Sequence, residues 1–545
     1  MRQIKRHICI LLCALITVSA LSGCANEEKA EQERFVLEAA VCGNITSLDP
    51  AMNTDAHTET VLCALYENLM RMEDDGEGNL TLVPGVAKEY KISENVDGTV
   101  EYLFTLRSAA HWSDGSRVRA RDFVYAWRRL ADPNTGSPNH GVLSMLQGYN
   151  EVRDTGDVTM LGVKAEGDNM LHVTLSAPCA YFLSETCTCT AAAPLRSDAV
   201  NKDPEWQSMT GVLSNGAYCV GAWTKDEFLQ LRRNTSYYNN RSSGPDVLRF
   251  RFVSSGSEAW SLYESGMVDM ALDVPAQAGA SGYIPLRSTA VVLYNHMSEA
   301  FSNKHVRKAF DLTLDRGAAA AAECAGAIPA TGLVPGGVTG VNADGGDFRA
   351  AGGTLCAADS EGYAMRCLDA EAELRNGGYW GGVGFPAVKC LYVAGEDARA
   401  VAAAAAASWN GRLNVNVTTE GLSREEFDRR IESGDYDLAI DTLSVHAGDA
   451  LDFLAPFAGS TNGGAINYGS TPYDLLIGVA KTSRDLAARY AFLHDAESLL
   501  LGDTALSPIC FCAETYVLRE GFEGLKRDHR GNVYFDSVSR IANDE

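Results

Sequence analysis

Positive charge is scarce in this sequence, and its scarcity excludes several classes of function. The 545 residues include 46 Lys and Arg against 71 Asp and Glu, which gives a formal net charge of −25. A protein this acidic repels nucleic acid and anionic lipid head groups, so neither is an expected partner. Beyond the first thirty residues there is no run of eighteen apolar residues, so the sequence predicts no further membrane-spanning helix.

Motifs for catalysis and metal binding are also missing. The chain has no G-x-S-x-G, H-E-x-x-H or C-x-x-C pattern, and its ten histidines stand singly along the sequence. We therefore expect no metal, no cofactor and no enzymatic activity. A catalytic carboxylate pair among the 71 acids remains open, although no pair stands out.

The N-terminal residues have the pattern of a bacterial lipoprotein signal peptide. Three cations and no acid precede an apolar segment at 8–20, which is too short to span a membrane comfortably. It ends in Leu21-Ser22-Gly23-Cys24, where small residues allow cleavage before Cys24 and its thiol accepts a diacylglycerol. We predict a signal peptide at 1–23 and a lipidated, charged tether at 24–35; an uncleaved anchor helix is the alternative. Cleavage changes the formal charge from −25 to −28, because the leader carries three cations and no acid.

Cysteine spacing gives less information. Three of the fifteen cysteines belong to the leader and the lipid site, which leaves twelve. The closest pairs, Cys187/Cys189 and Cys510/Cys512, are C-x-C and poorly spaced for a bond within the pair. Scattered free thiols are the favoured interpretation. Disulfides are the alternative, but the sequence does not indicate which cysteines would pair.

Local patterns alternate between strand and helix. Residues 100–106 alternate in polarity like a strand, and residues 121–130 place Phe123, Trp127 and Leu130 on one helical face. Ser423 and Glu426 form a capping box for a helix that ends near residue 434, before a strand at 436–440. The alanines at 400–407 predict a helix, and the small residues at 317–353 predict a loose loop region. This mixture predicts an α/β protein, and about 520 mature residues exceed one core, so two or three domains are expected.

A series of short motifs in order resembles one known family. Its opening is Ser47-Leu-Asp-Pro50 followed by Leu65-Tyr-Glu-Asn-Leu69, and later pieces include Trp112-Ser-Asp-Gly115, Ala120-Arg-Asp-Phe-Val-Tyr-Ala-Trp127, Asn215-Gly-Ala-Tyr218, Ser265-Gly-Met-Val-Asp-Met270 and Gly434-Asp-Tyr-Asp-Leu-Ala439. Each piece alone is weak, but together they cover nearly the whole mature chain. The chain resembles the extracellular solute-binding proteins of peptide/nickel ABC transporters, in particular the oligopeptide-binding branch.

The resemblance implies a two-lobed α/β fold with an extra inserted subdomain and a hinge that lets the lobes close on a ligand. It places lobe I at 36–62, 195–285 and 490–545, the inserted subdomain at 63–194, and lobe II at 286–489. It also implies an ABC permease as membrane partner, a peptide or small solute as ligand, and a monomer facing the periplasm or the cell exterior. In such proteins an extended peptide pairs its backbone with both lobes, a form of strand addition.

The resemblance also indicates which residues line the ligand cleft. The expected residues are Asn44, Ser47, Asn139, Asn295, Ile440, Leu443, His446, Asp449 and Asp452. Relatives have an aspartate that pairs with the peptide ammonium, at the position that His446 occupies here in a gapless alignment. A neutral imidazole cannot replace that charge, so either peptide is not the ligand or a neighbouring acid (Asp441, Asp449 or Asp452) takes the role. His446 as a loop residue without a ligand role is equally open.

Three hypotheses follow. The first is a transporter receptor that captures peptides or related small solutes. The second is an envelope receptor or signalling protein of the same fold that no longer serves uptake, and the third is an envelope enzyme. A permease and ATPase encoded beside the gene would favour the first, and turnover of a peptide would favour the third.

Overall fold

The computed structural model describes residues 34–53, 55–74, 80–179, 181–208, 210–239, 244–275, 281–324, 326–338, 340, 347–445, 448–459, 466–483, 485–528 and 532–541. The predicted signal peptide, the lipid site Cys24 and the candidate cleft residue His446 lie outside these ranges. None of the described helices is long and apolar enough to cross a membrane.

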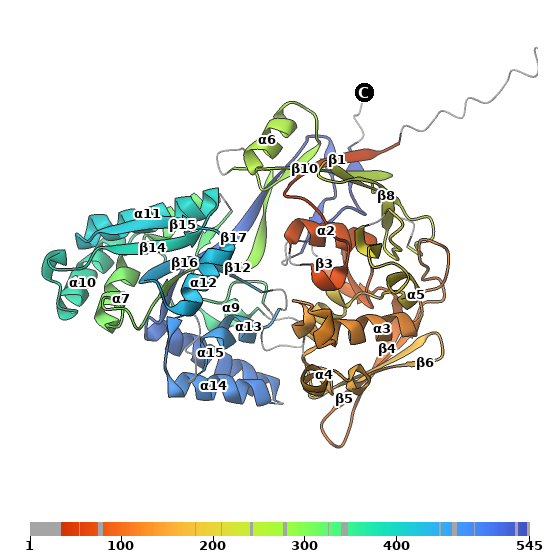
Figure 1. Cartoon of the computed structure of the whole chain (residues 1–545), viewed down its shortest axis with the longest axis horizontal. Coiled ribbons are helices and arrows are strands. Elements are labelled where there is room, and N and C mark those ends of the chain that lie inside the picture. Colours follow the sequence, from red (N-terminus) through yellow and green to blue (C-terminus); the bar gives the residue numbers. More distant parts are fainter. Residues whose placement is uncertain are drawn as a thin grey trace, which may run out of the picture.

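One sheet of eleven strands runs through both halves of the molecule (Figure 1). Its order is β15-β14-β16-β12-β17-β11-β1-β10-β9-β8, with β13 beside β17. The bounds are β1 Val36–Cys42, β8 Tyr218–Thr224, β9 Phe228–Arg233, β10 Val247–Val253, β11 Met270–Leu272, β12 Gly282–Tyr294, β13 Ile328–Pro329, β14 Val388–Val393, β15 Val417–Leu422, β16 Leu438–Ser444 and β17 Leu506–Leu518. Both parallel and antiparallel pairs occur in it, so the sheet is mixed.

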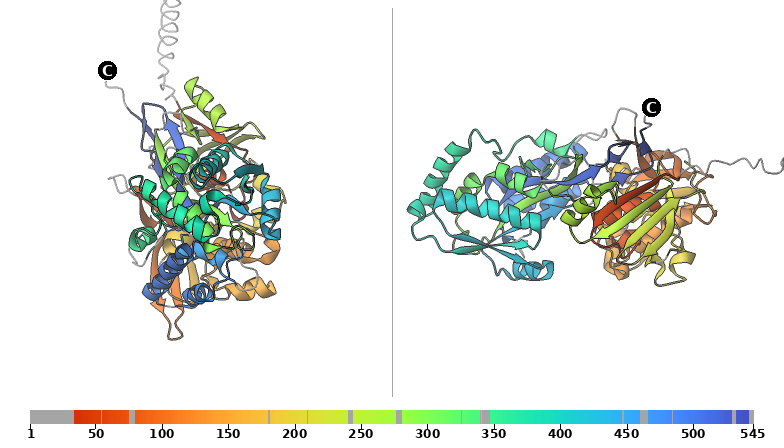
Figure 2. Two further views of the ribbon diagram at one scale, coloured as in Figure 1. Left: turned by 90° about the vertical axis from the view of Figure 1, so that its left-hand side faces the viewer. Right: turned by 90° about the horizontal axis from the view of Figure 1, so that it is seen from above.

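The two longest strands, β12 and β17, connect the lobes. Each has thirteen residues, and they pair with each other along most of their length. Their register shifts between Pro285 and Thr289, so the ladder is interrupted where the chain passes from one lobe to the other. Seen from above, the lobes lie side by side with these strands between them (Figure 2). This interruption is the natural position of a hinge.

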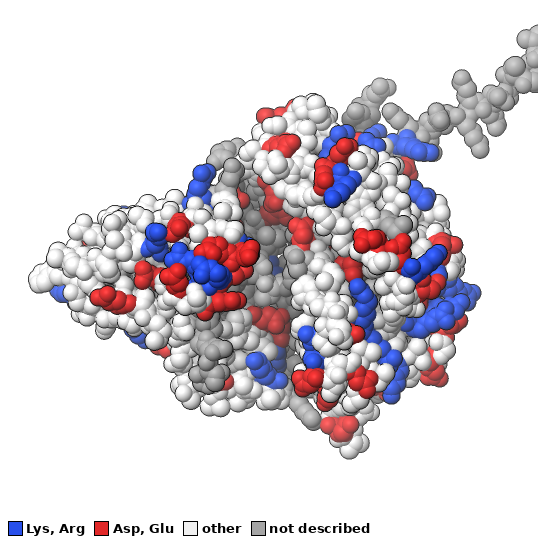
Figure 3. All heavy atoms as spheres, in the orientation of Figure 1, with Lys and Arg blue, Asp and Glu red and all other residues white. Residues whose placement is uncertain are grey.

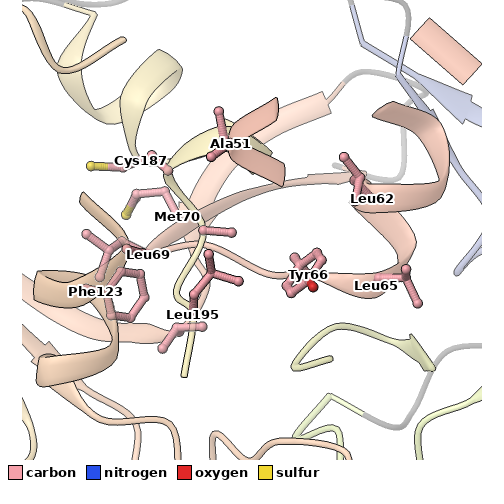
Figure 4. Packing of buried hydrophobic residues seen from close by; sticks show 14 of the residues in the cluster. Ala51, Leu62, Leu65, Tyr66, Leu69, Met70, Phe123, Cys187 and Leu195 are labelled. Carbon is pink, nitrogen blue, oxygen red and sulfur yellow. The ribbon is translucent and has the colours of Figure 1, made fainter. Parts of the chain in front are cut away.

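Lobe I and the inserted subdomain share one hydrophobic core. The subdomain holds a hairpin of β2 (Met70–Asp74) and β3 (Leu80–Pro84) and a four-stranded sheet, β4-β5-β7-β6, with bounds Ala87–Glu94, Val100–Leu106, Met170–Leu175 and Val163–Glu166. Figure 4 shows Leu62 and Leu65 beside Tyr66, and Phe123 beside Leu69, within that continuous cluster. The subdomain is therefore packed against lobe I through a continuous hydrophobic core.

Helices cover these sheets in both lobes. On the lobe I side they are α2 Ala56–Leu65, α3 Ala120–Ala131, α4 Tyr149–Thr155, α5 Ser197–Val200 and α6 Gly256–Glu264. On the lobe II side they are α7 Lys304–Thr313, α8 Arg316–Glu323, α9 Phe348–Gly352, α10 Tyr363–Asn376, α11 Glu396–Leu413, α12 Arg424–Ser433, α13 Ala450–Leu454, α14 Thr471–Thr482 and α15 Leu486–Gly502. Two further core clusters lie on lobe II, one against each face of its part of the sheet.

The predicted α/β, two-lobed fold is confirmed, and so are several local elements. β5 has the predicted bounds, and Phe123, Trp127 and Leu130 of α3 are fully buried. The Ser423 hydroxyl accepts from the Glu426 amide at 3.3 Å and caps α12, as predicted, although the Glu426 carboxylate binds Arg429 rather than completing the box. No disulfide joins any two of the twelve described cysteines.

One expectation needs revision. The region 317–353 is not a plain loop, because the Asp315 carboxylate accepts from the Ala318 amide and starts α8, whose alanines favour a helix. The domain boundaries stay predictions. Tyr490, Leu500 and Leu506 pack in one hydrophobic cluster with Val291 and Leu293 of β12.

Candidate functional site

A cleft separates the lobes, and Figure 3 shows it as a hollow lined by several acidic side chains. Its main cavity has a volume of about 780 Å³. One wall comes from the inserted subdomain, with Pro138, Asn139 and Tyr181, and the other comes from lobe II, with Ser444 and Asp452. Ligand pockets for small molecules have volumes of about 300–1,000 Å³, so this cavity has the size of a ligand site.

The end of β16 forms the lobe II wall of the cleft. Ile440–Thr442 line a neighbouring pocket of about 300 Å³, and Ser444 and Val445 line the main cavity. β16 pairs with β12 along its whole length but with β14 only from Leu438 to Ile440. Within the described residues, the backbone edge after Ile440 therefore has no strand partner on that side. An extended peptide adds to a sheet at such an edge.

Three acids were candidates to pair with a ligand ammonium, and the structure separates them. Asp449 is buried, pairs with both terminal nitrogens of Arg489 at 3.1 and 2.5 Å, and accepts from the Tyr181 hydroxyl at 3.0 Å. Asp441 pairs with Arg424 at 3.0 Å. Both carboxylates are therefore already neutralised by an arginine of the same lobe.

Asp452 differs from these two acids. Its side chain is exposed to the main cavity, and no ion pair to its carboxylate is found within the described chain. The surrounding protein and the nearby Asp449 raise the pKa of Asp452 from 3.8 to about 7, while Arg489 lowers it. Asp452 is thus the carboxylate in the cavity that still lacks a positive partner.

Among the described residues, two side-chain contacts join the lobes across the cleft, and both start from residues 181–185 of the subdomain. The Tyr181 hydroxyl donates to Asp449 at 3.0 Å. The second contact is buried: the guanidinium of Arg287 pairs with both carboxylate oxygens of Glu185 at 2.7 and 2.8 Å. Arg287 lies in the interrupted stretch between β12 and β17, and its Nε donates to the Gly337 carbonyl of lobe II at 2.8 Å. The ion pair therefore connects the hinge and lobe II to the subdomain.

Several predicted cleft residues lie elsewhere. Asn44 is exposed and donates to Asp226, and the Ser47 hydroxyl accepts from the Asp49 amide in a local turn. Asn295 lines a separate surface groove on lobe II and donates to the carbonyls of residues 434 and 436. None of the three lines either cavity of the cleft, because hydrogen bonds to their own lobe hold them away from it.

Asn139, Ile440, Asp449 and Asp452 do line the cleft, and Leu443 lies between its two cavities on β16. The Asn139 amide donates to the Asn53 carbonyl at 2.6 Å, so its polar group supports the wall. A ligand role for these residues stays a prediction.

Sequence reasoning did not find Arg489, Tyr181, Glu185 or Arg287. No motif marks them, because each functions through a partner that is distant in sequence: Arg287 and Glu185 are 102 residues apart. A single arginine in an otherwise buried strand is the one signal that the sequence offered for Arg287.

Comparison with known proteins identifies the family. The family model for bacterial extracellular solute-binding proteins, family 5 (middle region), matches residues 81–465, which is more than half of the chain. The chain belongs to this family.

Several known binding proteins are similar to this chain over most of their length. The periplasmic oligopeptide-binding protein OppA of Salmonella typhimurium is 28% identical over 97% of each chain. The probable deoxycholate-binding periplasmic protein YgiS of Escherichia coli is 28% identical over 85% of this chain and 86% of its own. The structure of the murein tripeptide binding protein MppA of E. coli superposes with a TM-score of 0.75 at 24% identity and covers 94% of this chain and 99% of that one. The fold is therefore that of this family's solved binding proteins.

Proposed function

We propose that this protein captures peptides or related small amines in the interlobe cleft and delivers them to an ABC permease. The observation that carries the proposal is the Asp452 carboxylate, which faces a cavity of about 780 Å³ without a positive partner in the described chain. A ligand ammonium would supply that partner. The similarity to OppA supports peptide as the ligand class.

The free edge of β16 after Ile440 supports the same proposal, because a peptide backbone would bind there as an added strand. Lys481 lines the same cavity as Asp452, so a zwitterionic ligand would find a partner for each of its charges. In relatives, the aspartate aligned with position 446 pairs with the peptide ammonium. In this protein Asp452 would have that role.

The proposed location is outside the cell membrane, with a lipid on Cys24 as the anchor. The signal-peptide pattern supports this, and so does membership of a family of extracellular proteins. Two or three acyl chains hold a protein stably because each buried methylene contributes about 0.8 kcal/mol. No catalytic step is proposed, and a monomer remains the expected state.

Calorimetry with an equimolar library of tri- to pentapeptides, and with the same library after N-acetylation, tests the proposal. We expect free peptides to bind the wild type and acetylated peptides to bind at least tenfold more weakly, a difference of about 1.4 kcal/mol. Asp452→Asn should remove this preference. Glu426→Gln, on the exposed surface of α12, is the matched control and should keep it.

Equal binding of both libraries by the wild type would contradict the ammonium-binding role of Asp452. A bile-acid-like ligand, as the name of YgiS indicates for that relative, would then be the candidate to test next. Transport and signalling are distinguished by uptake in cells with and without a peptide permease. Uptake that is lost without the permease and returns with it would favour transport; binding with no uptake in either case would favour a signalling role.

A further inference from the structure

A second cluster of polar side chains lies where lobe I meets the hinge. It consists of His57 on α2, Asp273 directly after β11, and Glu514 on β17. One ligand atom from each residue lies within 4.8 Å of the other two. In the part of the chain that the structure describes, no other group of His, Cys, Asp and Glu side chains meets this condition.

One carboxylate oxygen in this cluster lacks a partner. Glu514 is only 7% exposed, and its Oε1 accepts no hydrogen bond from any described residue. The nearest polar atom with a printed distance is His57 Nδ1, at 4.0 Å, which is too far for a hydrogen bond. A buried carboxylate oxygen without a partner is unfavourable, so the arrangement favours a bound cation.

The distances suit an ion. A zinc–nitrogen bond is about 2.0–2.1 Å long and a zinc–carboxylate bond about 2.0–2.2 Å, so two ligands of one ion lie roughly 3–4 Å apart. An imidazole gives one nitrogen to an ion, so the distances that count are those from a single nitrogen. His57 Nδ1 lies 4.0 Å from Glu514 Oε1, while Asp273 Oδ2 lies 3.0 Å from the other nitrogen, Nε2. One ligand atom from each of the three residues still lies within 4.8 Å of the other two. The Asp273 side chain is 47% exposed and can move to complete a site without disturbing the core.

A histidine elsewhere in the chain provides a contrast. His172 also lies between two carboxylates, but its Nδ1 contacts Glu101 at 2.8 Å and its Nε2 contacts Glu166 at 2.9 Å. Every ring nitrogen there has a direct partner, so that cluster is satisfied without an ion. The His57 cluster differs because the buried Glu514 Oε1 has no hydrogen-bond partner among the described residues and lies 4.0 Å from His57 Nδ1.

We propose that His57, Asp273 and Glu514 form a binding site for a divalent transition-metal ion of the zinc or nickel type. One imidazole nitrogen and two carboxylate oxygens are donors that such ions accept, whereas calcium and magnesium prefer oxygen alone. Three protein ligands leave the remaining coordination positions to water. The site ties α2 of lobe I to β17, the strand that enters lobe II. The proposal does not depend on the nature of the transported ligand.

Isothermal titration of chelator-treated full-length protein with zinc chloride tests the site. The wild type should bind one zinc ion that Glu514→Gln and Asp273→Asn each bind at least tenfold more weakly. Asp273→Asn is the safer variant for folding because its side chain is half exposed. Glu166→Gln removes a carboxylate beside His172 and should bind zinc as the wild type does.

The free thiols of the chain can also bind zinc, so the position of the ion is checked by anomalous diffraction from zinc-soaked crystals. The expected result is an anomalous peak between His57 and Glu514. Absence of zinc binding by the wild type, or equal binding by Glu514→Gln, Asp273→Asn and the wild type, would overturn the proposal.

Discussion

Replacing Glu185 by glutamine should open the two lobes. The change keeps the shape of the side chain but removes the charge that neutralises Arg287. Both groups are buried, with Arg287 1% and Glu185 6% exposed, and they are joined by hydrogen bonds of 2.7 and 2.8 Å. The uncompensated guanidinium would then favour a conformation in which water reaches it.

The size of the effect follows from this burial. Removing one partner of a buried ion pair costs about 3–5 kcal/mol. Because Glu185 belongs to the subdomain and Arg287 to the hinge strand, we assign that cost to the conformation in which the lobes touch. At about 1.4 kcal/mol per factor of ten, the ratio of closed to open molecules should fall by roughly two to three and a half powers of ten.

Small-angle scattering and calorimetry measure the two consequences. Glu185→Gln should have a larger radius of gyration than the wild type, and its ligand affinity should fall because the binding-competent conformation is rarer. Glu426→Gln is the control, since it breaks an ion pair with Arg429 that is exposed and worth at most about 1 kcal/mol.

An unchanged radius of gyration in Glu185→Gln would refute this reasoning. A lower melting temperature without opening would also refute it, because it would show that the pair stabilises the fold rather than the contact between the lobes.

Four further predictions concern the anchor, the cleft and the core. Cys24→Ala should incorporate no labelled acyl chain and should be shed or left uncleaved; normal labelling in membrane fractions would exclude this site. Affinity for a free peptide should rise as the pH rises through about 7, because Asp452 must lose its proton to pair with an ammonium, and should fall again above about 8, where the peptide ammonium loses its own proton; calorimetry on Asp452→Asn should show no such rise. Trp127→Ala should lower the free energy of unfolding by about 3–5 kcal/mol in urea titrations, since the indole is fully buried and donates to the Ala192 carbonyl. Gly448→Ala should weaken the lobe contact, because a Cβ there would lie 2.6 Å from Glu185 Oε1; scattering like the wild type's would contradict this.

Local elements could be predicted well because their signals are short-range. The polarity of residues 100–106 reproduces β5, and the Ser423 cap and Gly434 mark the two ends of α12, where Gly434 has a φ of 70° that favours glycine. The wrong prediction of a loop at 317–353 also concerns a short-range signal. Alanine and glycine are both small, but the alanines favour a helix once Asp315 caps it.

The family and the two-lobed fold could also be predicted, since a series of short motifs preserves their order along the chain. The cleft residues could be predicted only in part. Asp449 and Asp452 are both aspartates and lie close together in sequence, and only the folded structure shows that Arg489 pairs with Asp449 and not with Asp452.

By itself, then, the amino-acid sequence was enough to predict the α/β class, the family and the ends of a few helices such as α12, because each depends on residues near one another in the chain. The tertiary structure alone decided which charges meet. His57 and Asp273 are 216 residues apart and Arg287 and Glu185 are 102 apart, and no spacing rule connects such residues before the chain folds. Electrostatic interactions depend on distance in space and on burial, so the ion pair at the hinge, the free carboxylate in the cleft and the proposed metal site became visible only in the folded protein.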